Sequence, residues 1–191
     1  MSARVRVRFA PSPTGPLHIG GVRTALFNYL FAKRNQGDFI LRIEDTDQNR
    51  FVPGAEDYIL ESLKWCGIEP DESPVNKGPF GPYRQSDRKS IYKKYVDELV
   101  ANSTAYLCFD TPDALENKRK EAEAQGQTFI YNHSSRTQMC NSLTLTDAEL
   151  NDKLNSGEAY VVRFKIPLGR ELVFNDLIRG EIKIDTGLLD D

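Results

Sequence analysis

The stretch VRVRFAPSPTGPLHIGG, residues 5–21, decides the predicted fold of this chain. Arginine and apolar residues alternate over 5–10, a pattern that predicts a β-strand. Three prolines and a glycine follow and predict a loop, because they can neither continue a strand nor open a helix early. From about Gly20 to Asn35 the apolar residues recur at helical spacing, which predicts a helix with one buried face. That face comprises Val22, Ala25, Leu26, Tyr29 and Leu30.

A second strand is predicted after this helix. Gly37 stands where a helix C-terminal cap belongs, and the strand runs over 39–43 into the acidic turn Glu44-Asp-Thr-Asp47. Strand, helix and strand within roughly forty residues form one βαβ unit, which implies a parallel sheet with a right-handed crossover. The predicted fold class is therefore α/β, with a Rossmann-like parallel nucleotide-binding sheet. Further helices are expected over 53–66 and from the N-cap Ser86 onward. The second of them carries an apolar stripe that should be buried, namely Ile91, Tyr92, Tyr95, Val96, Leu99 and Val100.

The sequence changes character after about Tyr106 and predicts a second lobe of α+β type. Thr111 precedes a proline, and Thr146 opens a capping box, so a helix should begin after each of them. We therefore predict the first half of a nucleotide-binding domain over residues 1–104 and an inserted lobe over 105–191.

Short strands are also predicted in this second lobe. They alternate apolar and polar residues, which favours an antiparallel sheet with one solvated face. Their ranges are 159–166, 172–174 and 181–184. In the first of them, Arg163 and Lys165 should lie on the side opposite to the apolar residues.

Composition excludes several classes of protein. Hydrophobic residues make up 39% of the 191 residues, enough for a sizeable core plus a smaller lobe. The net charge of −3 does not indicate nucleic acid, although large RNA-binding enzymes often confine basic residues to one face. Three scattered cysteines do not form a disulfide framework, and the chain shows neither a signal peptide nor a membrane-spanning run. We expect a soluble cytoplasmic protein with reduced thiols.

The predicted sheet places polar residues where ligands bind, at the carboxyl ends of its strands. The first strand ends at 8–10 and the second at 42–45, with His18 between them at the start of a helix. A helix N-terminus binds anions, and His18 can donate a hydrogen bond to phosphoryl oxygens. Gly20 and Gly21 would let a base or a phosphate approach the backbone. Neither a Walker A loop nor a GxGxxG fingerprint occurs, so a different nucleotide site is required.

The motif over 11–21 resembles the HIGH signature of class I aminoacyl-tRNA synthetases, with Gly21 in place of its fourth letter. Glutaminyl members usually carry phenylalanine and paired aspartates where this chain has Ile43-Glu44-Asp45. Three ordered stretches are similar to the glutamyl members in particular, namely 8–15, 41–47 and 81–88.

The resemblance implies ATP-dependent attachment of L-glutamate to tRNA(Glu) through a glutamyl-adenylate, with ATP used as its Mg²⁺ complex. His18 matches the histidine that stabilises the phosphates, and Arg8 matches the arginine that pairs with the side-chain carboxylate of glutamate. Ser12 and Glu44 match residues that hold its α-amino group, and the alternative for Glu44 is a turn cap or an ion pair with Arg42. The implied ATP-binding residues are Pro11, His18, Gly20 and Gly21. The implied glutamate-binding residues are Arg8, Ala10, Ser12 and Glu44.

The resemblance also makes the second lobe a connective lobe that binds the tRNA acceptor stem. Arg163, Lys165 and Arg179 are candidates for contacts with tRNA phosphates, and a solvated strand face is the alternative for them. Some relatives bind zinc in this lobe through Cys-x-Cys followed by a tyrosine and a cysteine. Only one thiolate remains here, so no structural zinc is expected. The matching residues are Cys108, Asp110, Tyr131 and Ser135, and His133 and Cys140 are the other candidates.

Glutamyl enzymes run to several hundred residues, so this chain is expected to be an N-terminal fragment. It would lack the second nucleotide-binding half, the KMSKS loop and the anticodon domain, and alone it should not form adenylate efficiently. We expect a monomer with no membrane partner. Two alternatives remain open: a glutamyl-queuosine tRNA(Asp) synthetase, which is a shorter paralogue, and a non-catalytic RNA-docking module. The loss of zinc cysteines favours the full synthetase over the paralogue, and the intact motif residues argue against pure docking.

Overall fold

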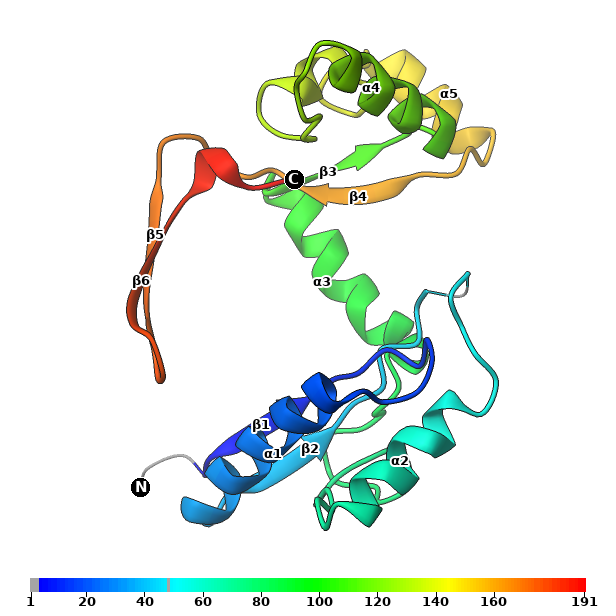
Figure 1. The fold of residues 1–191 in the computed structure, drawn as a ribbon. Helices are drawn as coiled ribbons and strands as arrows, with labels where there is room; N and C mark the ends of the chain where they lie inside the picture. Colours follow the sequence, from blue (N-terminus) through cyan, green and yellow to red (C-terminus); the bar gives the residue numbers. More distant parts are fainter. Residues whose placement is uncertain (1–3, 48) are drawn as a thin grey trace. The chain divides into compact units, whose positions relative to one another are not determined.

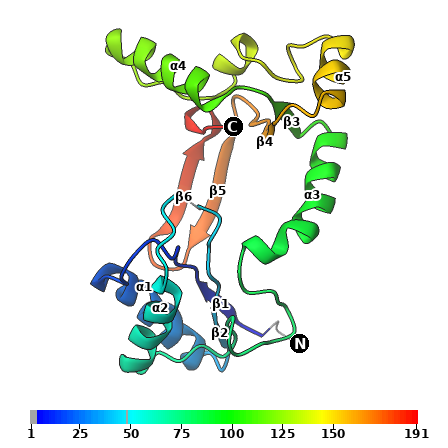
Figure 2. The same ribbon diagram turned by 90° about the vertical axis from the view of Figure 1, so that its right-hand side faces the viewer.

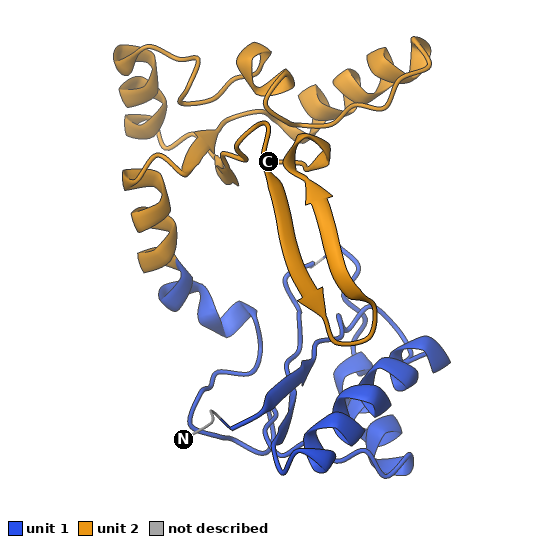
Figure 3. Ribbon diagram, turned by 90° about the vertical axis from the view of Figure 1, so that its left-hand side faces the viewer, with its two compact units in different colours: residues 1–92 blue, residues 93–191 orange. Residues whose placement is uncertain are grey.

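The computed structural model describes residues 4–47 and 49–191 (Figure 1). The chain divides into two compact units, Met1–Tyr92 (unit 1) and Lys93–Asp191 (unit 2), coloured separately in Figure 3. The division falls within helix α3 (Lys89–Ala101). Each unit has its own hydrophobic core.

Unit 1 is built on the predicted βαβ unit. Strand β1 (Arg6–Phe9) pairs in parallel with β2 (Asp38–Leu41), and α1 (Ile19–Arg34) connects them. The pairing continues beyond both strands, because the amide of Glu44 donates to the carbonyl of Pro11 at 3.0 Å. The α/β prediction with a parallel sheet is confirmed, and the polar residues that follow the two strands lie at one edge of that sheet.

The other edge of β2 is covered by the segment that follows α2 (Ala55–Trp65). Glu72 forms a parallel bridge with Ile40, and Arg84 forms one with Ile43. This segment therefore extends the sheet without forming a regular strand of its own. The core beneath it consists of Phe9, Ala25, Ala32, Phe39, Leu41, Ile43, Ile59, Leu63 and Ile68.

The buried face of α1 differs from the predicted one. Ala25 and Ala32 are completely buried, and Tyr29 packs against the same core. Leu26 and Leu30 are 41% and 55% exposed, so their place in the predicted buried face is wrong. Small alanine side chains allow a helix to lie close to a sheet, and this contact turns the larger leucines outward.

The C-terminal end of α1 also differs from prediction, because Gly37 is not its cap. Asn35 is the C-cap, and Gln36 adopts the left-handed conformation with φ of 51°. Gly37 lies so close to β1 that an added Cβ would collide with the carbonyl oxygen of Val5. Gly37 is therefore required by a close approach of two backbones.

This close approach predicts that Gly37→Ala lowers the free energy of unfolding of unit 1 by about 1–3 kcal/mol, the usual penalty for overpacking. Urea denaturation of the chain measures it. Gln36→Gly is the matched control and should not destabilise, because glycine accepts the left-handed conformation at that position. Equal stability of Gly37→Ala and the unsubstituted chain would contradict the assigned packing.

A partly buried ionic network links β1 to the segment after α2. Arg6 donates to both carboxylate oxygens of Glu72, at 2.5 and 2.9 Å, and the Tyr83 hydroxyl donates to the same carboxylate. The hydrogen bond from Arg6, helped by Tyr83, lowers the pKa of Glu72 despite the opposing effect of burial. The charged carboxylate therefore stabilises the folded state.

Because the pKa of Glu72 is lowered in the folded state, unit 1 is predicted to lose stability at acidic pH. A carboxyl group whose pKa is lower in the folded state stabilises above its unfolded pKa of about 4.3, and this contribution is lost as the pH falls through the folded value. Glu72→Gln should remove about 1.5–3 kcal/mol at pH 7, typical of hydrogen bonds to a charged group, and should weaken the pH dependence below pH 4. Denaturation curves between pH 2.5 and 7 measure both effects, and an unchanged acid slope would contradict this role.

Ser86 does not cap a long helix as predicted. It begins a short 3₁₀ turn (η1, Ser86–Arg88), and its hydroxyl donates to Asp45 Oδ2 at 2.6 Å. Helix α3 starts at Lys89, and none of its residues, all of which the structure describes, is buried. The predicted buried stripe is wrong, because helical spacing shows which residues share a face and does not show that another element covers it.

Unit 2 contains the two capped helices that the sequence predicts. Thr111 caps α4 (Pro112–Ala124), and Thr146 with Glu149 forms a capping box on α5 (Asp147–Asn155). Strand β3 (Ala105–Cys108), which was not predicted, pairs antiparallel with β4 (Val161–Phe164). The core beside this sheet consists of Tyr106, Cys108, Tyr131 and Met139.

The remaining strands form a separate hairpin. β5 (Glu171–Asp176) and β6 (Gly180–Asp185) run side by side (Figure 2). Both strands were predicted, but none of their residues is buried, so the expected core-facing side is absent from this hairpin. Within residues 4–47 and 49–191, no helix combines the length and apolar content needed to span a bilayer.

Candidate active site

His18 occupies the N-cap position of α1. Its Nδ1 accepts a hydrogen bond from the amide of Gly20 at 3.1 Å, in the manner of an N-cap side chain. In a neutral imidazole with Nδ1 as acceptor, the proton resides on Nε2. His18 can therefore donate from Nε2 to an anion at the positive end of the helix.

Gly20 and Gly21 lie close to the side chains of the two residues that precede α1. A Cβ added at Gly20 would lie 2.9 Å from Cε1 of His18, and one at Gly21 would lie 2.6 Å from a methyl group of Leu17. Both distances are shorter than side chains tolerate. Gly20 thus permits the observed orientation of His18, and Gly21 permits that of Leu17, in addition to the backbone access for a ligand that the sequence predicts.

A cavity of about 530 Å³ opens beside this helix N-terminus. Of the residues predicted for the site, Pro11, Ser12, His18 and Gly21 line it. Arg50 also lines it and was not predicted. Its Nε donates to Asp47 at 2.6 Å. The sequence feature that could have indicated Arg50 is a basic residue three positions after the last acidic residue of the turn.

Arg8 and Glu44 meet at the carboxyl ends of β1 and β2. Arg8 Nη1 lies 3.4 Å from Glu44 Oε1, and Arg42 Nη2 lies 2.8 Å from the same oxygen. The predicted guanidinium and carboxylate are thus in contact. The pair of Arg42 with Glu44, the alternative for Glu44, is present as well, so Arg42 is a third charged group at the site. Two cations and one anion give this cluster a net positive charge.

The acidic turn after Glu44 is held in place by Asp45. Its carboxylate accepts hydrogen bonds from the amide of Ser86 at 2.9 Å and from the hydroxyl of Ser86 at 2.6 Å. Burial alone would raise the pKa of Asp45, but these hydrogen bonds outweigh it and keep the pKa below its usual value. A charged Asp45 thereby fixes the backbone that carries Glu44.

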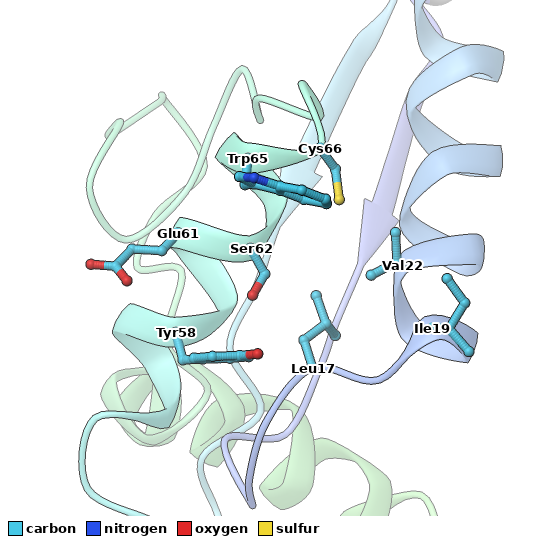
Figure 4. A pocket seen from close by; sticks show the side chains of 8 residues that line it. All are labelled: Leu17, Ile19, Val22, Tyr58, Glu61, Ser62, Trp65 and Cys66. Atoms are coloured by element: carbon cyan, nitrogen blue, oxygen red, sulfur yellow. The ribbon is translucent and has the colours of Figure 1, made fainter.

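A second cavity, of about 540 Å³, lies between α2 and the start of α1 (Figure 4). Leu17, Tyr58 and Trp65 contribute to its mainly apolar wall, and Glu61 is its charged lining residue. An apolar wall with a carboxylate does not suit phosphate groups. We therefore assign the anion site to the cavity beside His18.

The residues of unit 2 that match a zinc site in relatives do not fit a zinc ion here. Asp110 Oδ2 accepts hydrogen bonds from Tyr131 at 2.8 Å and from Cys108 at 3.2 Å. Arg163 donates to the sulfur of Cys108 at 3.4 Å, so a guanidinium lies against the thiol where a cation would bind. The hydroxyl of Ser135 bonds to nearby backbone groups instead. Among the residues described, no group of three or more His, Cys, Asp or Glu side chains is arranged to hold a metal ion.

Arg163 makes a second contact within unit 2. Its guanidinium stacks 3.9 Å from the ring centre of Tyr131. The predicted solvated side of β4 therefore faces the interior at Arg163. Lys165 and Arg179 are exposed and remain available to a phosphate group.

Comparison with known proteins identifies the family. The family model for the catalytic domain of class I tRNA synthetases (E and Q) matches residues 4–191. This chain belongs to the class I tRNA synthetases. The glutamate–tRNA ligase of Flavobacterium johnsoniae is 60% identical over the whole chain, and that of Christiangramia forsetii is 59% identical. The chain spans 38% of the length of each of these relatives.

Solved structures of class I tRNA synthetases agree with this assignment. The crystal structure of a glutamate tRNA ligase from Elizabethkingia meningosepticum in complex with its amino acid superposes with a TM-score of 0.92 and 55% identity. The enzyme from Elizabethkingia anophelis superposes with a TM-score of 0.93. Each match covers 98% of this chain and 38% of the other chain.

Proposed function

We propose that the protein containing this chain attaches glutamate to tRNA(Glu) in an ATP-dependent reaction. The observation that carries the proposal is the contact of Arg8 with Glu44 at the strand ends. The amide of Glu44 donates to the carbonyl of Pro11, and Pro11 lines the same cavity as His18, the N-cap of α1. Glutamate requires a cation for its side-chain carboxylate and an anion for its ammonium group, and ATP requires an anion site. The names of the relatives at about 60% identity support the same substrate.

In the proposed first step, an oxygen of the glutamate α-carboxylate forms a bond to the α-phosphorus of ATP. Pyrophosphate leaves, and glutamyl-adenylate remains bound. Negative charge on the phosphoryl oxygens grows in the transition state, and hydrogen-bond donors already in place stabilise it without reorganisation. The Nε2–H of His18 and the first amides of α1 are such donors, and ATP enters as its Mg²⁺ complex.

The glutamate side chain is proposed to bind Arg8, whose planar guanidinium matches a carboxylate. Glu44 would receive the α-ammonium group, with Ser12 beside it and Ala10 leaving space next to the strand end. Glutamine would place a neutral amide against Arg8 and would leave its charge poorly matched. Selection for glutamate follows from that difference.

In the second step the glutamyl group moves to the 2′-hydroxyl of the terminal adenosine of the tRNA, and AMP leaves. Unit 2 would contact the acceptor stem, with Lys165 and Arg179 as the exposed basic residues available to phosphates. Because the chain spans 38% of its relatives, we propose that it does not form adenylate efficiently by itself.

Replacement of His18 tests the proposal. In the full-length protein, His18→Ala should lower the rate of glutamate-dependent pyrophosphate exchange by about 10²–10³-fold, the usual effect of removing one transition-state donor. His133→Ala is the matched control, since it alters the other of the two histidines of the chain. An exchange rate of His18→Ala within twofold of the unsubstituted enzyme would show that His18 takes no part in the reaction. Charging of tRNA with an amino acid other than glutamate would overturn the proposed function.

A further inference from the structure

Arg42 occupies a fixed position beside the proposed glutamate site. Its amide donates to the carbonyl of Phe9 at 3.0 Å, which holds its backbone in the parallel sheet. Its Nη2 donates to Glu44 Oε1 at 2.8 Å, and the two side chains are 23% and 31% exposed. Its Nε is buried and has no hydrogen-bond partner among the residues described. In the orientation that brings Nη2 to Glu44, the Nε–H of Arg42 is thus left without a hydrogen bond.

Arg8 contacts the same carboxylate oxygen less closely. The distance from Arg8 Nη1 to Glu44 Oε1 is 3.4 Å, and the Arg8 side chain is 45% exposed. An arginine and a carboxylate without competitors frequently form a short bidentate pair. Such a pair would occupy both groups that the substrate needs. In this structure Arg42 holds Oε1, and no described residue donates to Oε2 of Glu44.

We propose that Arg42 is a positioning residue, which holds Glu44 toward the substrate ammonium and limits Arg8 to a long contact with Glu44, so that Arg8 can bind the substrate carboxylate. This inference rests on the proposed function. Charge counting agrees with it, because two guanidiniums and one carboxylate complement the two carboxylates and one ammonium of glutamate. Without Arg42, Arg8 and Glu44 would form a closer pair with each other and would have to separate for each molecule of glutamate.

Substitution of Arg42 in the full-length enzyme tests this role. Arg42→Gln should raise KM for glutamate by about 10- to 100-fold, the range expected for a displaced binding group, with a much smaller change in kcat. It should also lower the preference for glutamate over glutamine, because Arg8 becomes paired. Arg42→Lys retains the positive charge and should give an intermediate KM. Arg23→Gln on the exposed face of α1 is the matched control and should leave both constants unchanged.

A double-mutant cycle separates positioning from a merely structural role. In a Glu44→Gln background, the additional change Arg42→Gln should have at most a twofold effect on KM, because the group that it positions is already altered. Thermal melting tests whether each variant is folded. If Arg42→Gln does not fold, Arg42→Lys replaces it in the same cycle. Unchanged KM in Arg42→Gln, or equal effects in both backgrounds, overturns the inference. Failure of the unsubstituted enzyme to charge tRNA with glutamate would instead refute the proposed function.

Discussion

Replacement of Arg8 by glutamine is expected to lower kcat/KM for glutamate by about 30- to 4,000-fold in the full-length enzyme. Truncation of one partner of a hydrogen-bonded charge pair costs about 2–5 kcal/mol, and each 1.4 kcal/mol corresponds to a tenfold change. The substrate carboxylate would meet a neutral amide, and Glu44 would lose the cation 3.4 Å from its Oε1. Initial rates of tRNA charging at varied glutamate and glutamine concentrations measure the effect.

A matched control for Arg8 lies on the same strand face. Arg4 pairs with Asp38 at 2.6 Å, is largely exposed and has no part in the proposed site. Arg4→Gln should change kcat/KM by less than about twofold, since exposed ion pairs contribute about 0–1 kcal/mol to stability. Similar losses in both variants would mean that the strand, and not the substrate contact, had been damaged.

Replacement of Asp191 by alanine is expected to lower the free energy of unfolding of unit 2 by about 3–5 kcal/mol, the usual cost of removing one partner of a buried ion pair. The Asp191 side chain is completely buried and lies 3.3 Å from Arg136, whose side chain is 9% exposed. Asp191 also accepts hydrogen bonds from the Tyr106 hydroxyl at 2.6 Å and from the amide of Ile166 at 3.1 Å. The variant would leave the Arg136 charge buried without its counter-ion.

Two controls define the Asp191 experiment. Tyr106→Phe removes one hydrogen bond and should cost about 0.5–1.5 kcal/mol. Asp190→Ala alters the exposed neighbour and should remain within about 0.5 kcal/mol of the unsubstituted chain. Urea denaturation followed by circular dichroism measures all three variants. A loss below 1 kcal/mol for Asp191→Ala would show that this carboxylate does not hold unit 2 together.

Features that depend on neighbouring residues were predicted well. The caps at Thr111 and Thr146 are confirmed, because a hydroxyl three positions before an amide can bond to it without help from the rest of the chain. The parallel pairing of β1 with β2 is confirmed for a related reason, since the helix length between two strands leaves few ways to pair them.

Predictions of burial were less successful. Leu26 and Leu30 were assigned to the buried face of α1 because they share helical spacing with Ala25. Contact with the sheet buries Ala25 as predicted, but it buries Ala32 in place of the two leucines. Arg163 was assigned to a solvated strand face, yet its guanidinium stacks on Tyr131. Both errors have one origin: a periodic pattern groups residues into faces, and only the partner element determines which face is covered.

The sequence by itself determined the βαβ unit, the family resemblance and the residues of the His18 motif, because each of these depends on short spacing along the chain. Only the tertiary structure placed Arg42 and Arg8 on one oxygen of Glu44, and Asp191 against Arg136 and Tyr106. The contacts of Arg8 and of Asp191 join segments that are far apart in the sequence, whereas Arg42 and Glu44 are only two positions apart. Their geometry is set by strand register and by the packing of buried side chains, which no local pattern specifies.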